Sequence, residues 1–292
     1  MKAADGEEIG FAILAVGKFG GREMNYGSDL DVLFFFSRDG ETEKGLLAGM
    51  YFNELAQTLA RAFEERTALG ALYTLDARLR PNGNKGPLAS SLEAFERYWK
   101  EGDLCDWERL ALTRARFVAG DARTGERAEH LIRSAVYSPL RSKELATEVR
   151  AMRKRLEETA SADDIKRGRG GLADIEFLTQ YLQLQHGSAF PPIRKTNTKE
   201  ALQTLMKLKK LPDAAGKALL EGYGFFSLLA NRLRVVHGLS ANTLPEQASD
   251  LRKLALRAGY FDSPDGDAGK ALRADYERIR KSVREIFEQL VH

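Results

Sequence analysis

Residues 11–36 read FAILAVGKFGGREMNYGSDLDVLFFF and contain the features that decide the fold. Two short apolar runs, 11–16 and 30–36, have the length and composition of buried strands. The segment between them is rich in glycine and leads into Ser28-Asp29-Leu30-Asp31. The pattern therefore predicts two strands joined by a tight connection, with a pair of acidic residues at the head of the second strand.

The flanking sequence supplies the remaining elements. Residues 71–79 alternate with period two, which predicts a third strand, and the turn sequence PNGN at 81–84 ends it. Between the second and third strands, apolar residues recur every three to four positions, as in an amphipathic crossover helix. Beyond residue 142 the sequence favours helices at 143–160, 171–186, 197–209, 212–237, 248–258 and 268–290. We expect an α+β fold, with a small mixed sheet and helices over residues 1–125 and an all-α helical bundle over 126–292.

Composition excludes several classes of protein. The chain has 292 residues, of which 43% are hydrophobic and 30% charged, a globular balance with no apolar run long enough to span a bilayer. One cysteine and four scattered histidines exclude a disulfide scaffold and a Cys/His zinc module. The net charge of +3 does not indicate nucleic-acid binding. We expect a cytoplasmic protein with no membrane or nucleic-acid partner, and the early first strand suggests a piece of a longer polypeptide.

Three carboxylates form the candidate catalytic site. Asp29 and Asp31 are two residues apart, so on a strand they share one face at a spacing of roughly 6.6–6.8 Å. Asp76 lies on the polar face of the third predicted strand and can complete a triad. Oxygen ligands without sulfur suit Mg²⁺ or Mn²⁺, and a carboxylate cluster of this kind can hold two metal ions for phosphoryl or nucleotidyl transfer. Taken alone, an Asp-x-Asp pair also occurs in turn caps and on solvated strand edges.

Neighbouring residues are candidates for binding the phosphates of ATP. Gly20 and Gly21 let the backbone approach a ligand, and their amides can form an anion nest. The Ser28 hydroxyl can donate to a phosphate oxygen. Arg78 and Arg80 follow Asp76 and can neutralise phosphate charge. The sequence has no phosphate-binding loop of the GxxxxGK[ST] type, and the GxGxxA match at 168–173 lacks the preceding strand that NAD binding requires.

Other charged residues have structural interpretations beside functional ones. Asp174 falls on an apolar helix side, where it complements the helix N-terminus or pairs with Lys166 or Arg169 near a nucleotide; both alternatives stay open. For the pair Arg114 and Arg116 we favour a salt-bridge network over phosphate binding. The helix face at 150–155, which includes Arg153, is expected to be solvated, and the face at 176–183, which includes Glu176, is expected to be polar.

These residues resemble the nucleotidyltransferase superfamily typified by DNA polymerase β and, within it, the glutamine synthetase adenylyltransferases. The stretches that carry the resemblance are GKFGGREMNYGSDLDVLF at 17–34, LYTLDARLRPNG at 72–83, DWERLALTRARFVAGD at 106–121 and DIKRGRGGLADIEFLTQYLQL at 164–184. The resemblance implies a polymerase β-like catalytic domain followed by helices. It also implies that Asp29, Asp31 and Asp76 bind metal and that ATP is the substrate.

Enzymes of this family contain two similar catalytic units, one that adds AMP to a tyrosine of glutamine synthetase and one that removes it by phosphorolysis. Three segments of this chain look more like the adenylylating unit: DAR at 76–78, TRAR at 113–116 and GLADIE at 171–176. The resemblance further implies glutamine synthetase as partner and control by glutamine and a PII signalling protein. The adenylyl-removing unit and a non-catalytic nucleotide-binding copy remain alternatives.

Overall fold

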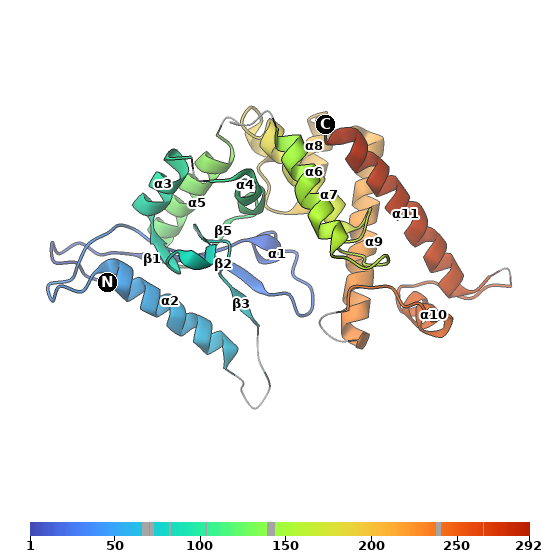
Figure 1. Ribbon diagram of the computed structural model, residues 1–292, viewed down its shortest axis with the longest axis horizontal. Coiled ribbons are helices and arrows are strands. Elements are labelled where there is room, and N and C mark those ends of the chain that lie inside the picture. The colour runs from blue at the N-terminus through green and yellow to red at the C-terminus, as the bar shows by residue number, and fades with distance from the viewer. Residues whose placement is uncertain are drawn as a thin grey trace. The chain divides into compact units, whose positions relative to one another are not determined.

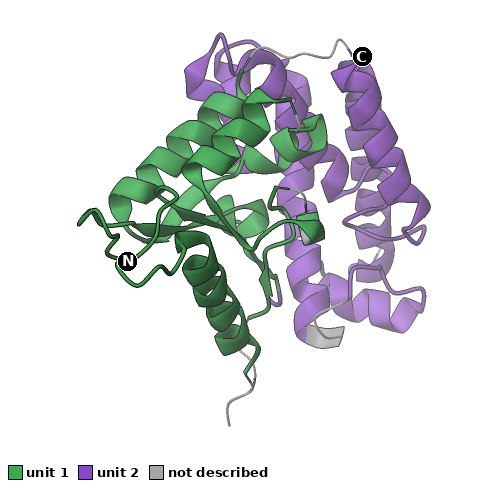
Figure 2. Ribbon diagram, turned by 60° about the vertical axis from the view of Figure 1, so that its left-hand side comes forward, with its two compact units in different colours: residues 1–24, 28–139, 195–197 green, residues 25–27, 140–194, 198–292 purple. Residues whose placement is uncertain are grey.

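The computed structural model describes residues 1–65, 70, 73–81, 83–102, 104–138, 144–237, 241–264 and 266–292. Its contacts divide the chain into two compact units (Figure 2). The first comprises residues 1–24, 28–139 and 195–197, and the second comprises 25–27, 140–194 and 198–292. No helix of the described residues is both long enough and apolar enough to cross a membrane.

The first unit is built on a mixed sheet. Strand β2 (Leu30–Phe36) pairs antiparallel with β1 (Phe11–Ala15) and parallel with β3 (Leu75–Asp76) and β4 (Ala89–Ser91). Strand β5 (Arg116–Gly120) pairs antiparallel with the other side of β1, which gives the order β3-β2-β1-β5. The structure confirms the two strands predicted at 11–16 and 30–36, and with them the small mixed sheet.

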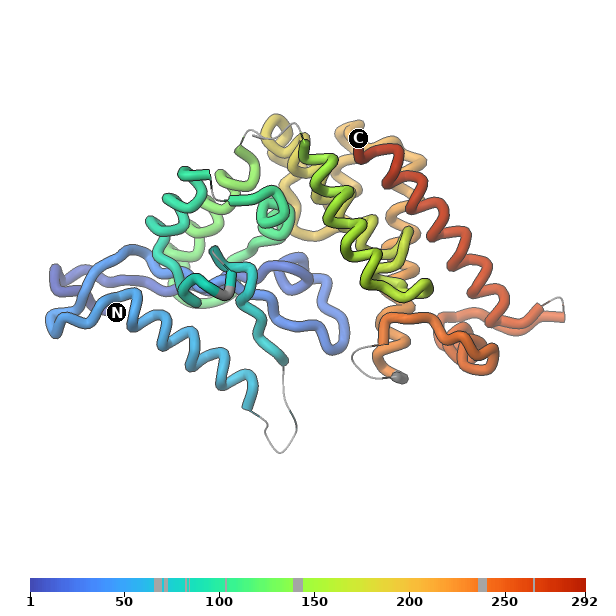
Figure 3. Tube along the Cα trace, viewed as in Figure 1, coloured from blue at the N-terminus to red at the C-terminus, as the bar shows by residue number. Residues whose placement is uncertain are grey.

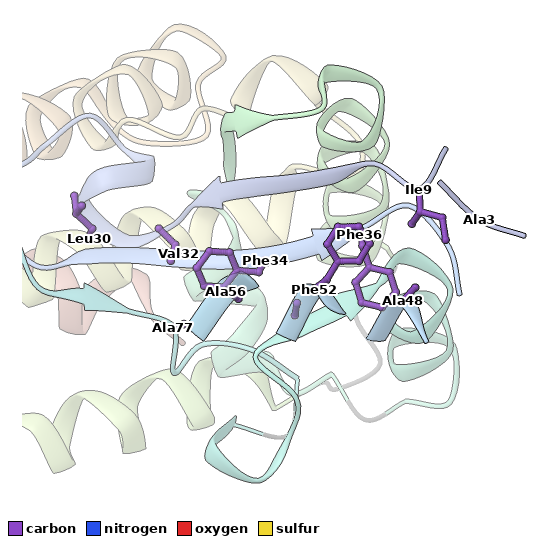
Figure 4. Close-up of a cluster of buried hydrophobic side chains, with 11 residues drawn as sticks. Ala3, Ile9, Leu30, Val32, Phe34, Phe36, Ala48, Phe52, Ala56 and Ala77 are labelled. Atoms are coloured by element: carbon purple, nitrogen blue, oxygen red, sulfur yellow. The ribbon is translucent and has the colours of Figure 1, made fainter. Parts of the chain in front are cut away.

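Helices cover both faces of this sheet because β2 is apolar on both sides. On one face, Phe52 of α2 (Ala48–Glu64) stacks on Phe11 and Phe36, with ring centroids 5.4 and 5.2 Å apart. Figure 4 shows this core, with Val32, Phe34 and Phe36 directed toward α2. On the other face, Phe35 meets Phe95 of α3 (Leu92–Lys100) edge to face, and α5 (Ala122–Val136) packs on β1 and β5. Short helices α1 (Gly17–Gly20), α4 (Asp106–Leu112) and η1 (Gly83–Lys85) join these elements (Figure 1).

The described part of the second unit is helical apart from isolated bridges (Figure 3). Its helices are α6 (Leu145–Glu158), α7 (Leu172–His186), η2 (Pro191–Ile193), α8 (Thr198–Lys207), α9 (Asp213–His237), α10 (Ala248–Arg257) and α11 (Ala268–Leu290). The six longer helices match those predicted from periodicity. Gly259 ends α10 with a φ of +94°, a backbone conformation that favours glycine.

Two predictions about the first unit need correction. The third strand, expected at 71–79, is confined to Leu75–Asp76, and residues 71–72 and 82 lie outside the described part. The strand ends there because the Asp76 carboxylate accepts the backbone N–H of Arg78 at 2.9 Å, which turns the chain. The first domain was expected to end at residue 125, but that position lies within α5, which packs on the sheet and belongs to the first unit.

Candidate functional site

The sheet brings two of the three predicted acidic residues into register. In the parallel pair β2–β3, Leu30 is opposite Leu75 and Asp31 is opposite Asp76. Residues opposite each other in a parallel pair point to the same face of the sheet, so Asp31 and Asp76 share a face. Asp29 directly precedes β2. Asp29 is exposed, Asp31 is half-buried, and the side chain of Asp76 is 15% exposed. The third acid therefore lies next to the first two, at the head of β2.

The guanidinium of Arg78 lies among these carboxylates. Its Nε donates to both carboxylate oxygens of Asp76 at 2.9 Å, and Nη2 makes a further ion pair with the same group. Hydrogen bonds from Arg78 lower the pKa of Asp76, so this carboxylate is ionised at neutral pH. The hydrogen bond to Asp76 raises the pKa of Arg78, and the charges of Asp29 and Asp31 add to that shift. One exposed guanidinium thus pairs with Asp76 and lies in the electrostatic field of Asp29 and Asp31.

The donor atoms at this site are carboxylate oxygens, which suit a hard divalent cation. The cation that they face in this structure is the guanidinium of Arg78. The described residues nevertheless contain no group of three or more His, Cys, Asp or Glu side chains positioned to hold a metal ion. Arg78 occupies the oxygens of Asp76 that a metal would need. Because the Arg78 side chain is 74% exposed, it can leave Asp76 at little cost in buried surface.

The Gly20-Gly21 pair has a different role in the structure from the one predicted. The amide of Gly20 donates to the carbonyl of Val16 at 2.8 Å, and that of Gly21 donates to Gly17 at 3.1 Å. These bonds close the turn of α1, so the two amides do not form the expected anion nest. A Cβ on Gly20 would lie 2.0 Å from the carbonyl oxygen of Arg114, which shows why glycine is needed for packing there.

Gly17 was not among the predicted site residues. This residue has a φ of +54°, and a Cβ at its position would lie 2.2 Å from Oδ2 of Asp31. Glycine is therefore required both by the backbone conformation and by the approach of the Asp31 carboxylate. The signal available in the sequence was a glycine directly after the apolar run at 11–16.

Ser28 and Arg80 lie near the acidic residues. Ser28 is half-buried and directly precedes Asp29 at the entry to β2. Arg80 donates to the carbonyls of Ala77 at 2.8 Å and Gly86 at 3.3 Å, so it braces the loop that follows β3. Its charge also lowers the pKa of Asp76, after the larger effect of Arg78. Phosphate binding by Ser28, Arg78 and Arg80 remains a prediction.

Arg114 forms an ion pair, as the favoured interpretation predicted, whereas Arg116 donates to backbone carbonyls. Arg114 forms a buried ion pair with Glu23, with Nη1 3.4 Å from Oε2. Arg116 donates to the carbonyls of Phe19 at 3.0 Å and Gly20 at 3.1 Å. Both arginines therefore hold the segment that leads from β1 into β2.

In the second unit, Asp174 is fully buried at the start of α7 and pairs with neither of the predicted partners. It accepts Nε of Arg153 at 2.6 Å and the backbone N–H of Gly170, and Nη1 of Arg284 lies 3.4 Å away. Burial raises the pKa of Asp174, and the two arginines counteract this shift.

Two expectations about helix faces in this unit were wrong. Arg153, assigned to a solvated face, is 1% exposed because it reaches Asp174 and the carbonyl of Gly168. On α7, Thr179 and Gln183 of the expected polar face are buried, and their side chains hydrogen-bond to the carbonyls of Ile175 and Ile193.

The comparisons with known proteins agree with the arrangement of two units. The model of the glutamate-ammonia ligase adenylyltransferase family matches residues 1–131, and that of the GlnD PII-uridylyltransferase family matches residues 140–291. A bifunctional glutamine synthetase adenylyltransferase/adenylyl-removing enzyme of Rhodopseudomonas palustris strain TIE-1 is 37% identical over 96% of this chain. Relatives with the same name from Xanthomonas axonopodis pv. citri and Stenotrophomonas maltophilia are 36% and 37% identical over 88% and 86% of the chain.

These alignments cover only part of each relative. The chain spans 28% of the length of the Rhodopseudomonas and Xanthomonas proteins and 27% of the Stenotrophomonas protein. The match nevertheless extends through the acidic site of the first unit and the helices of the second. The chain therefore contains a domain of the glutamate-ammonia ligase adenylyltransferase family at residues 1–131, and over most of its length it is similar to part of the bifunctional glutamine synthetase adenylyltransferase/adenylyl-removing enzymes.

Proposed function

We propose that this chain is a nucleotidyltransferase unit that moves AMP from ATP to a tyrosine of glutamine synthetase. The observation that carries the proposal is the register of Asp31 with Asp76, with Asp29 directly before β2. The names of the relatives support the acceptor, since each is a glutamine synthetase adenylyltransferase/adenylyl-removing enzyme. Within this proposal the protein acts in the cytoplasm.

In this proposal Asp29, Asp31 and Asp76 hold Mg²⁺ or Mn²⁺. When bound, a pair of such ions supplies Lewis-acid stabilisation of the attacking and leaving oxygens. Arg78 leaves Asp76 and binds a phosphate oxygen of ATP. Its exposed guanidinium binds a triphosphate more strongly than a single carboxylate, because the triphosphate carries more negative charge. Ser28 and Arg80, next to the acidic residues in the sequence, are the further candidates for phosphate contact.

The reaction joins the tyrosine oxygen to the α-phosphorus and breaks the bond from that phosphorus to the bridging oxygen of pyrophosphate. The tyrosine proton passes to a carboxylate, and Asp76 is our candidate once Arg78 has left it. The low pKa of Asp76 in the resting arrangement comes first from its hydrogen bonds with Arg78. Loss of these bonds makes Asp76 a better proton acceptor.

The second candidate is the adenylyl-removing reaction, which the printed names of the relatives also include. It would use the same carboxylates, with phosphate as the attacking group and AMP-modified glutamine synthetase as substrate. The DAR, TRAR and GLADIE segments favour the adenylylating direction. A PII protein is a further partner in this proposal. The name of the family matched at 140–291 refers to PII.

The test is to incubate the chain with glutamine synthetase and ATP labelled in the α-phosphate, and in parallel with AMP-modified synthetase and phosphate. We expect label on the synthetase in the first reaction, and its loss in Asp29→Asn and Asp31→Asn. Glu54→Gln, an exposed position of α2 in the same unit, is the matched control and should keep full transfer. Undiminished transfer by either Asp variant would refute the proposed site, and ADP formation only in the second reaction would assign the adenylyl-removing direction.

A further inference from the structure

The carbonyl end of the one-turn helix α1 is held by side chains from distant parts of the sequence. Arg116 donates through Nη2 to the carbonyl of Phe19 at 3.0 Å and through Nε to that of Gly20 at 3.1 Å. Nδ2 of Asn197 donates to the next carbonyl, that of Gly21, at 3.0 Å. Three consecutive carbonyls thus each accept a side-chain donor, which is more than a single helical turn needs for its own closure.

The other end of α1 touches the acidic site. Gly17, its first residue, lies against the Asp31 carboxylate, where a Cβ would approach Oδ2 to 2.2 Å. The backbone N–H of Val16, just before α1, donates to the carbonyl of Asp31 at 2.9 Å. A shift of α1 along its axis would therefore move the group that limits where the Asp31 carboxylate can lie.

Arg116 reaches α1 from the sheet. On β5 it is the register partner of Ala15 on β1, and Ala15 is the partner of Val32 on β2, the residue after Asp31. The guanidinium also lies over the ring of Phe19, 5.9 Å from its centroid. Burial lowers the pKa of Arg116, with a smaller contribution from the charge of Arg22. Placing a cation here is unfavourable unless the bonds that it makes compensate for the lost hydration.

We propose that Arg116 is a positioning residue for the acidic site: by holding the carbonyls of α1, it fixes Gly17 against Asp31 and so fixes the carboxylate for metal binding. This inference rests on the proposed function, because it assigns Arg116 a role toward the same metal-binding carboxylates. Arg116 itself touches neither metal nor nucleotide in this mechanism. It acts through α1, as an outer hydrogen-bonding group acts through a metal ligand.

A purely structural role would give a different pattern of effects. Loss of a capping interaction lowers the stability of the first unit but leaves the affinity for metal unchanged in the molecules that remain folded. A positioning role changes the affinity for the metal at temperatures where the variant is fully folded. The two roles are separated by measuring metal binding and thermal unfolding on the same variants.

The experiment measures Mn²⁺ binding to the protein without ATP, which itself binds Mn²⁺, by the loss of the electron paramagnetic resonance signal of free Mn²⁺. We expect Arg116→Ala to weaken Mn²⁺ binding about tenfold, within the range seen for outer groups of metal sites. Arg116→Lys keeps a donor for one of the two carbonyls and should recover part of the affinity. Arg97→Ala removes an exposed arginine of α3 in the same unit and should bind Mn²⁺ as the unaltered chain does. Circular dichroism gives the unfolding temperature of each variant.

Unchanged Mn²⁺ affinity in a folded Arg116→Ala protein would overturn the positioning role. If that variant does not fold, Arg116→Lys decides, because an affinity equal to that of the unaltered chain overturns the inference in the same way. Asp31→Asn separates this failure from failure of the proposed function. If Asp31→Asn abolishes Mn²⁺ binding while both Arg116 variants retain it, only the role of Arg116 is wrong; if Asp31→Asn also retains it, the metal site itself is wrong.

Discussion

Gly17 shows how a single residue without a side chain shapes the acidic site. Its φ of +54° costs an L-residue about 1–2 kcal/mol, and a Cβ would meet the carboxylate of Asp31. We expect Gly17→Ala to lower AMP transfer about 100-fold, since a displacement of about 1 Å at a reacting group can have that effect. Steady-state transfer assays test this. The control is Gly49→Ala in α2, where a Cβ meets nothing within 4 Å. This variant should keep full activity.

The ion pair between Arg78 and Asp76 predicts a dependence on pH. Hydrogen bonds from Arg78 lower the pKa of Asp76 below its ordinary value of 3.8. The pair therefore stabilises the fold fully above pH 3.8, and this contribution is lost as the pH falls through the lowered pKa of Asp76. In Arg78→Gln we expect the pKa of Asp76 to rise toward 3.8, as measured by carboxyl carbon chemical shifts in an NMR titration. An unchanged titration would show that Arg78 does not hold this carboxylate in solution.

At the scale of single residues, the sequence predicted the acidic site better than its surroundings. The sequence placed Asp76 beside Asp31, and the pairing of β2 with β3 brings these two residues into register. The shared face of Asp29 and Asp31 stays a prediction from strand alternation. The partners of Arg153 and Gly17 could not be predicted. Arg153 pairs with Asp174, 21 positions away, and nothing in the spacing of charges on its own helix distinguishes a buried arginine from a solvated one.

The elements of the two units differ in how well periodicity revealed them. The helices α6 to α11 span ten residues or more, and most have a clear apolar stripe, which made their positions predictable to within a few residues. Strand β3 could not be delimited, because its two residues are defined by pairing with β2 and by the turn at Arg78. Strand β5 and helices α3 and α5 were not predicted as separate elements. β5 is defined by its pairing with β1, which lies far from it in the sequence.

Helix α2 allows a prediction at the scale of an element. Phe52 is 2% exposed and stacks on two rings of the sheet, so Phe52→Ala would leave a cavity. We expect it to lower the free energy of unfolding of the first unit by about 3–5 kcal/mol. Met50, 64% exposed on the same helix, provides the control, and Met50→Ala should change the free energy by less than about 0.5 kcal/mol. Urea unfolding measures both, and equal values for the two variants would contradict the packing of α2 on the sheet.

At the scale of the whole molecule, the two units carry different kinds of polar group. The first presents its carboxylates at the edge of a sheet, where Asp29 is exposed and Arg78 is mostly in solvent. The second buries a charged cluster of Arg153 and Asp174 beneath the loop that begins α7. The change from sheet to helices was predictable from the sequence. The end of the first unit was not, because it depends on the packing of α5 on β1 and β5.

The buried pair leads to a prediction that distinguishes the two units. Asp174→Ala leaves the guanidinium of Arg153 buried without its carboxylate, and removal of one partner of such a pair costs about 3–5 kcal/mol. Both tryptophans, Trp99 and Trp107, lie in the first unit, so their fluorescence reports its unfolding, whereas circular dichroism also reports the helices of the second. In Asp174→Ala we expect the dichroism transition to shift to lower urea while the fluorescence transition stays in place. Phe52→Ala should shift the fluorescence transition. A shift of the fluorescence transition in Asp174→Ala would mean that the two cores unfold as one cooperative structure.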